Sequence, residues 1–147
     1  MSDFLKDIIK SSGNEYAGIV SEGIEGSDVT GFIDTGSYAF NALLSGSLYG
    51  GIPNNKIMAL AGESATGKTY FALGVCKKFL DDNPEGMILY FDTESAVTSD
   101  MIKERGLDPN RVAVFPVATV EGFRHQAISI VDTYIETKEK KPVFVVL

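Results

Sequence analysis

Residues 62–69 carry the pattern of a loop that binds phosphate groups. They follow G-x-x-x-x-G-K-[ST] at every fixed position. In such a loop the glycines let the backbone approach a phosphate closely, and consecutive N–H groups point inward at the anion. Lys68 would reach the β- and γ-phosphates of a nucleoside triphosphate, and the hydroxyl of Thr69 would bind Mg²⁺. The predicted binding residues are Gly62, Glu63, Ser64, Ala65, Thr66, Gly67, Lys68 and Thr69.

Two acidic side chains form a second candidate group. Asp92 and Glu94 follow directly after an apolar run at residues 87–91. Ligands bind at the carboxyl ends of strands in an open α/β sheet. A carboxylate there can orient or deprotonate the water that attacks a γ-phosphate. Position alone leaves both acids as candidates, and it also leaves the alternative that one of them caps the following segment.

Both groups need a strand before them and a helix beside them, and the apolar pattern predicts such elements. Short apolar runs predict buried strands at residues 57–61, 87–91, 112–115 and 142–147. Helical spacing predicts helices at residues 68–80, at residues 99–105 and from Thr119 onward. The apolar face of the last helix would comprise Val120, Phe123, Ala127, Ile130, Tyr134 and Ile135. This alternation predicts an α/β fold with a mostly parallel sheet and helices on both faces.

The first third of the chain has a different composition. Eleven of the 15 glycines lie at or before Gly67. Apolar spacing predicts short helices at residues 3–11 and 37–45, with a glycine-rich linker between them. We therefore expect two segments: an N-terminal helix and linker at residues 1–33, and the sheet-containing segment at residues 34–147.

The composition restricts the class of protein. The chain has 147 residues, of which 44% are hydrophobic and 22% are charged, as in one globular domain of ordinary size. Its one cysteine, Cys76, cannot form an internal disulfide, and we expect it to be a packing residue. No apolar run approaches the roughly 18 residues of a membrane span. The N-terminus has acids where a signal peptide has bases, so the expected location is the cytoplasm, without a membrane partner.

The charge balance argues against a general nucleic-acid-binding surface. Thirteen Lys and Arg residues stand against 20 Asp and Glu residues, which gives a net charge of −7. An acidic surface repels phosphate backbones at long range. Contact with nucleic acid therefore needs a local basic patch or residues outside this chain.

Several short motifs together resemble the core of RecA-type recombinases, and among these the UvsX-type strand-exchange proteins of bacteriophages, including cyanophages. The motifs are Asp34-Thr35-Gly36, Leu43-Leu44-Ser45-Gly46, Gly50-Gly51-Ile52-Pro53, the 62–69 loop, Asp92-Thr93-Glu94 and Gly106-Leu107-Asp108-Pro109-Asn110-Arg111-Val112. The loop alone is common to many NTPases. The joint spacing of the motifs is far more specific.

The resemblance implies an ATPase that forms a helical filament on single-stranded DNA and drives homologous pairing in recombination and repair. It implies that ATP and Mg²⁺ are the cofactors, that ATP lies between neighbouring subunits, and that Glu94 rather than Asp92 is the catalytic carboxylate. It also implies that the N-terminal helix and the patch at residues 16–20 dock on the adjacent subunit. For a phage gene, the implied location is the cytoplasm of the host cell.

Two departures from the family pattern affect these expectations. Family members often carry an aromatic residue, stacked on adenine, about seven positions after the catalytic Glu. Met101 stands at that place and is our candidate adenine contact. The family's Walker B aspartate, its DNA-binding loops and its γ-phosphate-sensing residue would all follow Leu147. We therefore expect an amino-terminal fragment of a RecA-like P-loop core, truncated after the Walker B strand.

Two other functions remain open. One is a helicase or clock-type ATPase on the same core. Open filaments on single-stranded DNA would favour a recombinase, whereas closed rings would favour a helicase. The other is a fragment that binds nucleotide or a partner without hydrolysing ATP.

Overall fold

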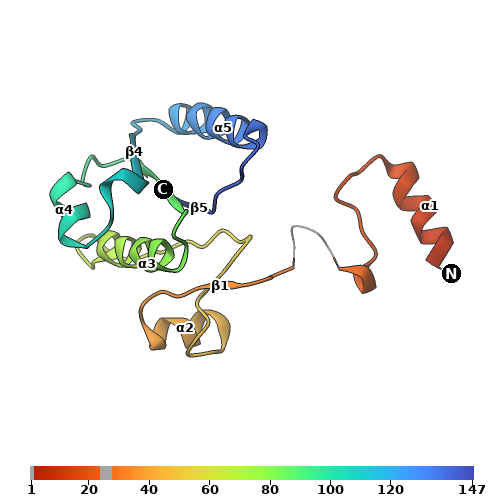
Figure 1. Cartoon of the computed structure of the whole chain (residues 1–147), viewed down its shortest axis with the longest axis horizontal. Helices are drawn as coiled ribbons and strands as arrows, with labels where there is room; N and C mark the ends of the chain where they lie inside the picture. Colours follow the sequence, from red (N-terminus) through yellow and green to blue (C-terminus); the bar gives the residue numbers. More distant parts are fainter. Residues whose placement is uncertain (1, 24–27) are drawn as a thin grey trace. The chain divides into compact units, whose positions relative to one another are not determined.

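The computed structural model of the chain describes residues 2–23 and 28–147, which form two compact units. The first unit comprises the described residues up to 33 together with residues 38–59. The second unit comprises residues 34–37 and 60–147, and it contains the phosphate loop and the sheet (Figure 1). The functional division at residues 33 and 34 stays a prediction.

The second unit is built on a parallel sheet of three strands. β3 (Met87–Asp92) lies between β4 (Val112–Pro116) and β5 (Val143–Val146). Residues Ile88–Asp92 pair with Val112–Pro116, and residues Met87–Tyr90 pair with Val143–Val146. These three strands confirm the parallel α/β arrangement that the apolar runs predict, and they give β3 the central position from which Asp92 and Glu94 emerge.

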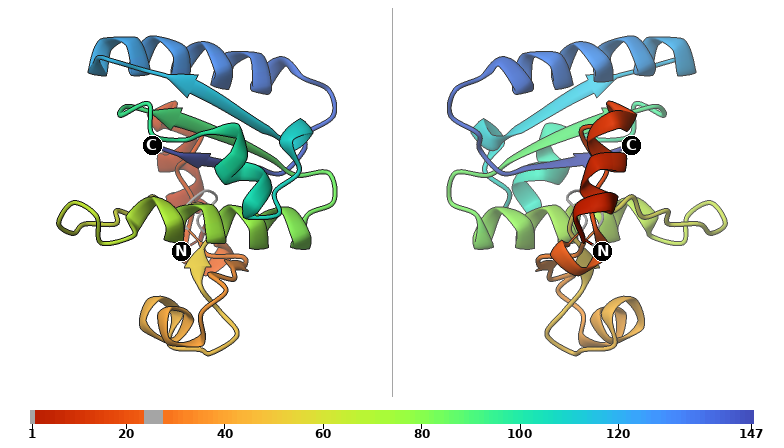
Figure 2. Two further views of the ribbon diagram at one scale, coloured as in Figure 1. Left: turned by 90° about the vertical axis from the view of Figure 1, so that its left-hand side faces the viewer. Right: turned by 90° about the vertical axis from the view of Figure 1, so that its right-hand side faces the viewer.

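Helices cover both faces of this sheet (Figure 2). On one face lies α3 (Lys68–Asp82), whose Phe79 ring is 5.4 Å from the ring of Phe144 in β5. On the other face lies α5 (Val120–Glu136), whose Phe123 ring meets the Phe91 ring edge-on at 4.9 Å. Successive residues of a strand point to opposite faces, so Tyr90 lies on the α3 side when Phe91 lies on the α5 side.

The α3 packing also explains Cys76. Leu73, Val75 and Cys76 of α3 are buried in the core of this unit. Burial raises the pKa of the Cys76 thiol to about 12, so the thiol stays protonated and unreactive at neutral pH. Its predicted role as a packing residue is confirmed.

The other two α-helices described in this unit, α4 and α5, begin where the sequence predicts. α4 (Ser99–Glu104) is capped by the Thr98 side chain, which accepts a hydrogen bond from the backbone N–H of Met101. Thr119 caps α5 in the same way, with Gly122 as donor at 3.0 Å. Phe123, Ala127, Ile130 and Tyr134 form the half-buried stripe of α5. Val120 and Ile135 are exposed, so their predicted place on that face is wrong.

The predicted strand at residues 57–61 is also wrong. The segment has no strand pairing, and the Ile57 side chain is fully exposed, at 103% of its reference area. The boundary between the two units falls inside this run, after Ala59. A buried strand needs a neighbour for its N–H and C=O groups, and the strands β4, β3 and β5 pair only with one another among the described residues. An apolar run alone therefore does not make a strand.

The first unit holds short elements, and its helix at the N-terminus exposes apolar side chains. Its elements are α1 (Ser2–Ser12), the 3₁₀ turn η1 (Val20–Glu22), β1 (Phe32–Ile33), α2 (Tyr38–Ser45) and β2 (Ile52–Pro53). β1 and β2 pair antiparallel. At Gly51, where φ is +136°, a Cβ would lie 2.1 Å from the carbonyl oxygen of Ile33, so this turn requires glycine. Phe4, Leu5 and Ile8 of α1 are exposed, and their docking role stays a prediction.

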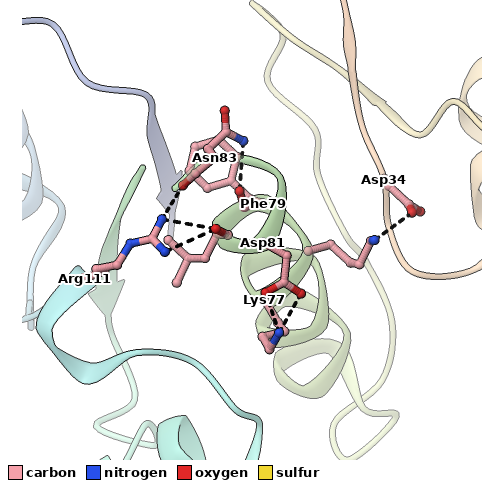
Figure 3. Close-up of polar contacts among 8 residues, drawn as sticks. Asp34, Lys77, Phe79, Asp81, Asn83 and Arg111 are labelled. Atoms are coloured by element: carbon pink, nitrogen blue, oxygen red, sulfur yellow. Dashed lines mark hydrogen bonds and ion pairs between the residues drawn. The ribbon is translucent and has the colours of Figure 1, made fainter. Parts of the chain in front are cut away.

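Arg111 joins β4 to the end of α3, a contact that the sequence patterns did not indicate. Its guanidinium donates hydrogen bonds to the carbonyl oxygens of Leu80, Asn83 and Gly86. Figure 3 shows Arg111 beside Asn83 at the end of α3. The bond to Gly86 is 2.9 Å long. A helix C-terminus leaves carbonyl groups without intrahelical partners, and a cation there also interacts favourably with the helix dipole. Arg111 donates to such carbonyl groups and places its positive charge at the negative end of the α3 dipole.

Replacing Arg111 with alanine is expected to lower the free energy of unfolding by about 2–3 kcal/mol, because three part-buried carbonyl groups lose a charged donor. Urea denaturation followed by circular dichroism measures this change. The matched control is Arg124→Ala on the exposed side of α5, with an expected change within about 0.5 kcal/mol. Equal effects of the two replacements would contradict the role given to Arg111.

No described helix has the length and apolar character needed to cross a membrane.

Candidate nucleotide-binding site

The phosphate loop (residues 62–69) turns the chain into the first residue of α3. Gly67 precedes the helix with φ +89° and ψ 16°, a left-handed conformation that glycine adopts without strain. Ala65 also has a positive φ, +61°. An added Cβ at Gly67 would meet nothing within 4 Å, so the space beside its backbone is open. The loop therefore presents its backbone to an open space at the N-terminus of α3, where the helix dipole favours an anion.

The Lys68 ammonium folds back over this loop. Its Nζ donates hydrogen bonds to the carbonyl oxygens of Gly62, at 3.0 Å, and Glu63, at 2.8 Å. The Thr66 hydroxyl donates to the same Glu63 oxygen at 2.8 Å. These contacts hold the positive charge above the loop, beside the first turn of α3. A lysine ammonium next to a helix N-terminus combines a positive charge with backbone N–H donors, which is what a polyphosphate requires.

Tyr90 of β3 lies near Thr69 of the loop and is only 7% exposed. Burial raises the pKa of Tyr90, and the charges of Asp92 and Glu94 raise it further, while the neighbouring Thr69 hydroxyl lowers it. One phenol therefore lies near both predicted groups, Thr69 from the loop and the two carboxylates that follow β3.

Asp92 and Glu94 have different surroundings. Asp92 is buried, and its carboxylate accepts hydrogen bonds from the backbone N–H groups of Glu94, at 3.2 Å, and Val97, at 2.9 Å. Burial alone would raise the pKa of Asp92, but the N–H groups of Val97, Ala96, Glu94 and Ser95 outweigh it and hold the pKa below its usual value. Asp92 therefore holds the turn after β3 in place, as in the alternative that one of the two acids caps the following segment. Glu94 is exposed.

Replacing Asp92 with asparagine is expected to lower the free energy of unfolding by about 1–3 kcal/mol at pH 7, since an amide cannot accept both backbone bonds. The folded-state pKa is depressed, so this stabilisation is complete well above the ordinary aspartate value of 3.8. It declines as the pH falls through the lower folded pKa. Denaturation at several pH values measures the effect.

The control for this replacement is Asp132→Asn on the exposed surface of α5, which is expected to change stability little at any pH. A difference between wild type and Asp92→Asn that persisted unchanged at pH 2 would contradict the assignment.

The helix that carries Met101 contacts α3 through Arg105. Met101 and Arg105 are four residues apart, on one side of α4 and its C-cap. The Arg105 guanidinium lies over the Tyr70 ring, 3.5 Å from its centroid, and Tyr70 comes two residues after Lys68. Arg105, at the C-cap of α4, thus contacts the first turn of α3, and the contact of Met101 with adenine stays a prediction. The sequence patterns missed Tyr70, Tyr90 and Arg105, although Tyr70 directly follows the loop motif.

The side chains at this site fit Mg²⁺ only when nucleotide phosphates supply further ligands. Among the described residues there is no cluster of three His, Cys, Asp or Glu side chains able to hold a metal ion. Mg²⁺ characteristically keeps several waters and binds through one or two protein groups plus substrate phosphates. The Thr69 hydroxyl would be one such protein group.

Comparison with known proteins gives an independent result. No family model matches the chain. The recombination and repair protein of Enterobacteria phage T4 is 30% identical over 147 residues, which is 99% of this chain and 36% of the phage protein. Protein RecA of Malacoplasma penetrans is 35% identical over 88 residues, or 60% of this chain and 25% of that protein. The mitochondrial DNA repair protein recA homolog 3 of Arabidopsis thaliana is 30% identical over 70% of this chain and 22% of its own length.

The homologues of the chain are recombination and repair proteins and RecA proteins at 30–35% identity, which supports the RecA-type recombinase family. The predicted resemblance is thereby confirmed, and the parallel sheet with its helices agrees with a RecA-like core. The chain spans about a third of the length of the phage T4 relative and a quarter of the Malacoplasma RecA.

Proposed function

We propose that this chain provides the nucleotide-binding part of an ATP-dependent recombinase. The observation that carries the proposal is the Lys68 ammonium, held over the phosphate loop at the N-terminus of α3 by the carbonyl groups of Gly62 and Glu63. Incoming phosphates would replace those two carbonyl groups as the partners of Lys68. The exchange is favourable because a charge-assisted hydrogen bond to an anion is stronger than one to a neutral carbonyl.

Each predicted residue then has a defined role. The backbone of residues 62–69 surrounds the phosphates, Lys68 stabilises negative charge on the transferring phosphoryl group, and Thr69 supplies a hydroxyl to Mg²⁺. When bound, Mg²⁺ neutralises charge on the phosphate oxygens. Glu94 orients or deprotonates the attacking water, because the Asp92 carboxylate is already occupied by the turn. Met101 contacts adenine, as its position seven residues after Glu94 implies from the resemblance to RecA-type recombinases.

The wider function rests on the relatives. Their names describe recombination and DNA repair. We place this chain in the same process, in which ATP binding controls a filament on single-stranded DNA. The exposed Phe4, Leu5 and Ile8 of α1 would dock on the adjacent subunit of the filament. The net charge of −7 is consistent with DNA contacts made mainly by residues outside this chain. The proposed location is the cytoplasm, of the host cell if the gene belongs to a phage.

Electron microscopy of the natural gene product that carries this chain tests the proposal. The product is mixed with single-stranded DNA in the presence and absence of Mg²⁺ and ATP. Open filaments that need both DNA and ATP are the expected result. Closed rings would instead indicate the helicase-type alternative. Assemblies indifferent to ATP would contradict a nucleotide-controlled recombinase.

A further inference from the structure

We propose that Asp92 is a positioning residue for ATP hydrolysis: its buried carboxylate bridges the two ends of the turn that carries Glu94 and so holds the Glu94 carboxylate where it can activate water. The inference rests on the proposed function, because it concerns the same reaction at the same site. It gives Asp92 a measurable part in turnover, in addition to its effect on stability.

The Asp92 carboxylate uses both of its oxygens in this turn. Its Oδ1 accepts a hydrogen bond from the backbone N–H of Glu94 at 3.2 Å, and its Oδ2 accepts one from the backbone N–H of Val97 at 2.9 Å. The two bonds join the beginning and the end of the segment from Glu94 to Val97. The next residue, Thr98, caps α4, so the turn is fixed between the end of β3 and the start of a helix.

Asp92 is itself held in place by the sheet. It lies in the central strand and pairs with Pro116 of β4. Its carbonyl oxygen accepts a hydrogen bond from the N–H of Val117 at 3.0 Å, and both Asp92 and Val117 are buried, at 6% and 5% exposure. A side chain on a strand supports a functional group more precisely than a side chain on a loop does. The Asp92 carboxylate therefore ties the backbone of Glu94 to the rigid part of this unit.

The backbone between the two hydrogen bonds has a conformation that needs such support. Ser95 has φ +53°, in the left-handed region that residues with a Cβ rarely adopt. A residue stays in that region only where the surrounding structure holds it there. Glu94 is exposed, so packing does not hold its side chain in place. Without the Asp92 bonds, we expect Ser95 to relax to a negative φ and the neighbouring Glu94 side chain to change direction.

The experiment measures kcat and KM for ATP in the natural gene product, below the unfolding temperature of each variant. Asp92→Asn keeps the size of the side chain but leaves one acceptor oxygen for two N–H donors. It is expected to lower kcat by at least about tenfold, because a small displacement of a catalytic group is costly in rate. KM is expected to change by less than about threefold, since the phosphate loop is intact.

A double-mutant cycle with Glu94→Gln distinguishes positioning from a general loss of structure. If Asp92 acts through Glu94, Asp92→Asn has no further effect on kcat in the Glu94→Gln background. A general loss of structure would lower kcat by the same factor in both backgrounds. Amide hydrogen exchange without nucleotide gives a second measurement: the N–H of Glu94 or of Val97 is expected to exchange at least about tenfold faster in Asp92→Asn.

The matched control is Asp108→Asn. The Asp108 carboxylate also accepts a hydrogen bond from the backbone N–H two residues later, that of Asn110 at 2.9 Å, but Asp108 precedes β4. Because β3 and β4 are parallel, it lies near the opposite end of the sheet from Asp92. Asp108→Asn is expected to leave kcat unchanged.

Three results would overturn the inference while the proposed function stands: a normal kcat in folded Asp92→Asn, an equal loss of kcat in the Glu94→Gln background, or unchanged exchange of both amides. A wild-type gene product that neither binds nor hydrolyses ATP would overturn both.

Discussion

Replacing Lys68 with alanine is expected to lower the affinity for Mg²⁺-ATP by at least about a hundredfold. Lys68 is the cation that the loop holds in place, with its Nζ 2.8 Å from the Glu63 carbonyl oxygen. A hydrogen bond to a charged group is worth about 1.5–3 kcal/mol, and Lys68 would make two, to the β- and γ-phosphates. The combined loss corresponds to two or more orders of magnitude in the dissociation constant. Isothermal calorimetry measures it directly.

The control is Lys77→Ala, on the same helix. Lys77 pairs with Asp81 on the exposed side of α3, an i, i+4 ion pair of small energetic value. Its removal is expected to change ATP affinity by less than about twofold. If Lys68→Ala bound ATP as well as Lys77→Ala did, the loop would not be a phosphate site.

Glu94→Gln is expected to lower ATP turnover by at least about a hundredfold and to leave ATP affinity within about threefold of wild type. An amide keeps the shape of the side chain but cannot accept a proton from the attacking water, and general-base catalysis typically contributes about 10²–10⁴ in rate. The expected pattern is a loss in kcat without a matching rise in the dissociation constant. Phosphate release by the natural gene product gives kcat, and calorimetry gives the affinity.

Glu104→Gln, in the last turn of α4, serves as the control because its side chain is exposed. It is expected to keep full turnover. Full turnover in Glu94→Gln would show that another group activates the water. The burial of Asp92 in its turn argues against Asp92 as that group.

The phosphate loop and the parallel strands were predictable because their signals are local. The loop depends on two glycines, one lysine and one threonine at fixed spacing, and the backbone at Gly67 has the left-handed conformation that the motif requires. Strands β3, β4 and β5 are short apolar runs between polar turns. Their pairing follows from the helices that connect them.

Other features depend on contacts between distant residues, which a sequence pattern does not contain. Residues 57–61 have the composition of a buried strand, yet no neighbouring strand accompanies them. Arg111 contacts the end of α3 across more than 20 residues of sequence. Position after β3 did not separate Asp92 from Glu94, because the hydrogen bonds that occupy the Asp92 carboxylate form only in the folded turn.

Titration of the wild-type chain with Mg²⁺-ATP in a calorimeter tests the central claim most directly, since every assigned role depends on a phosphate-binding loop at residues 62–69. A saturable heat with one nucleotide per chain, absent in Lys68→Ala, is the predicted result. No heat with wild type, together with no displacement of a fluorescent ATP analogue, would contradict it.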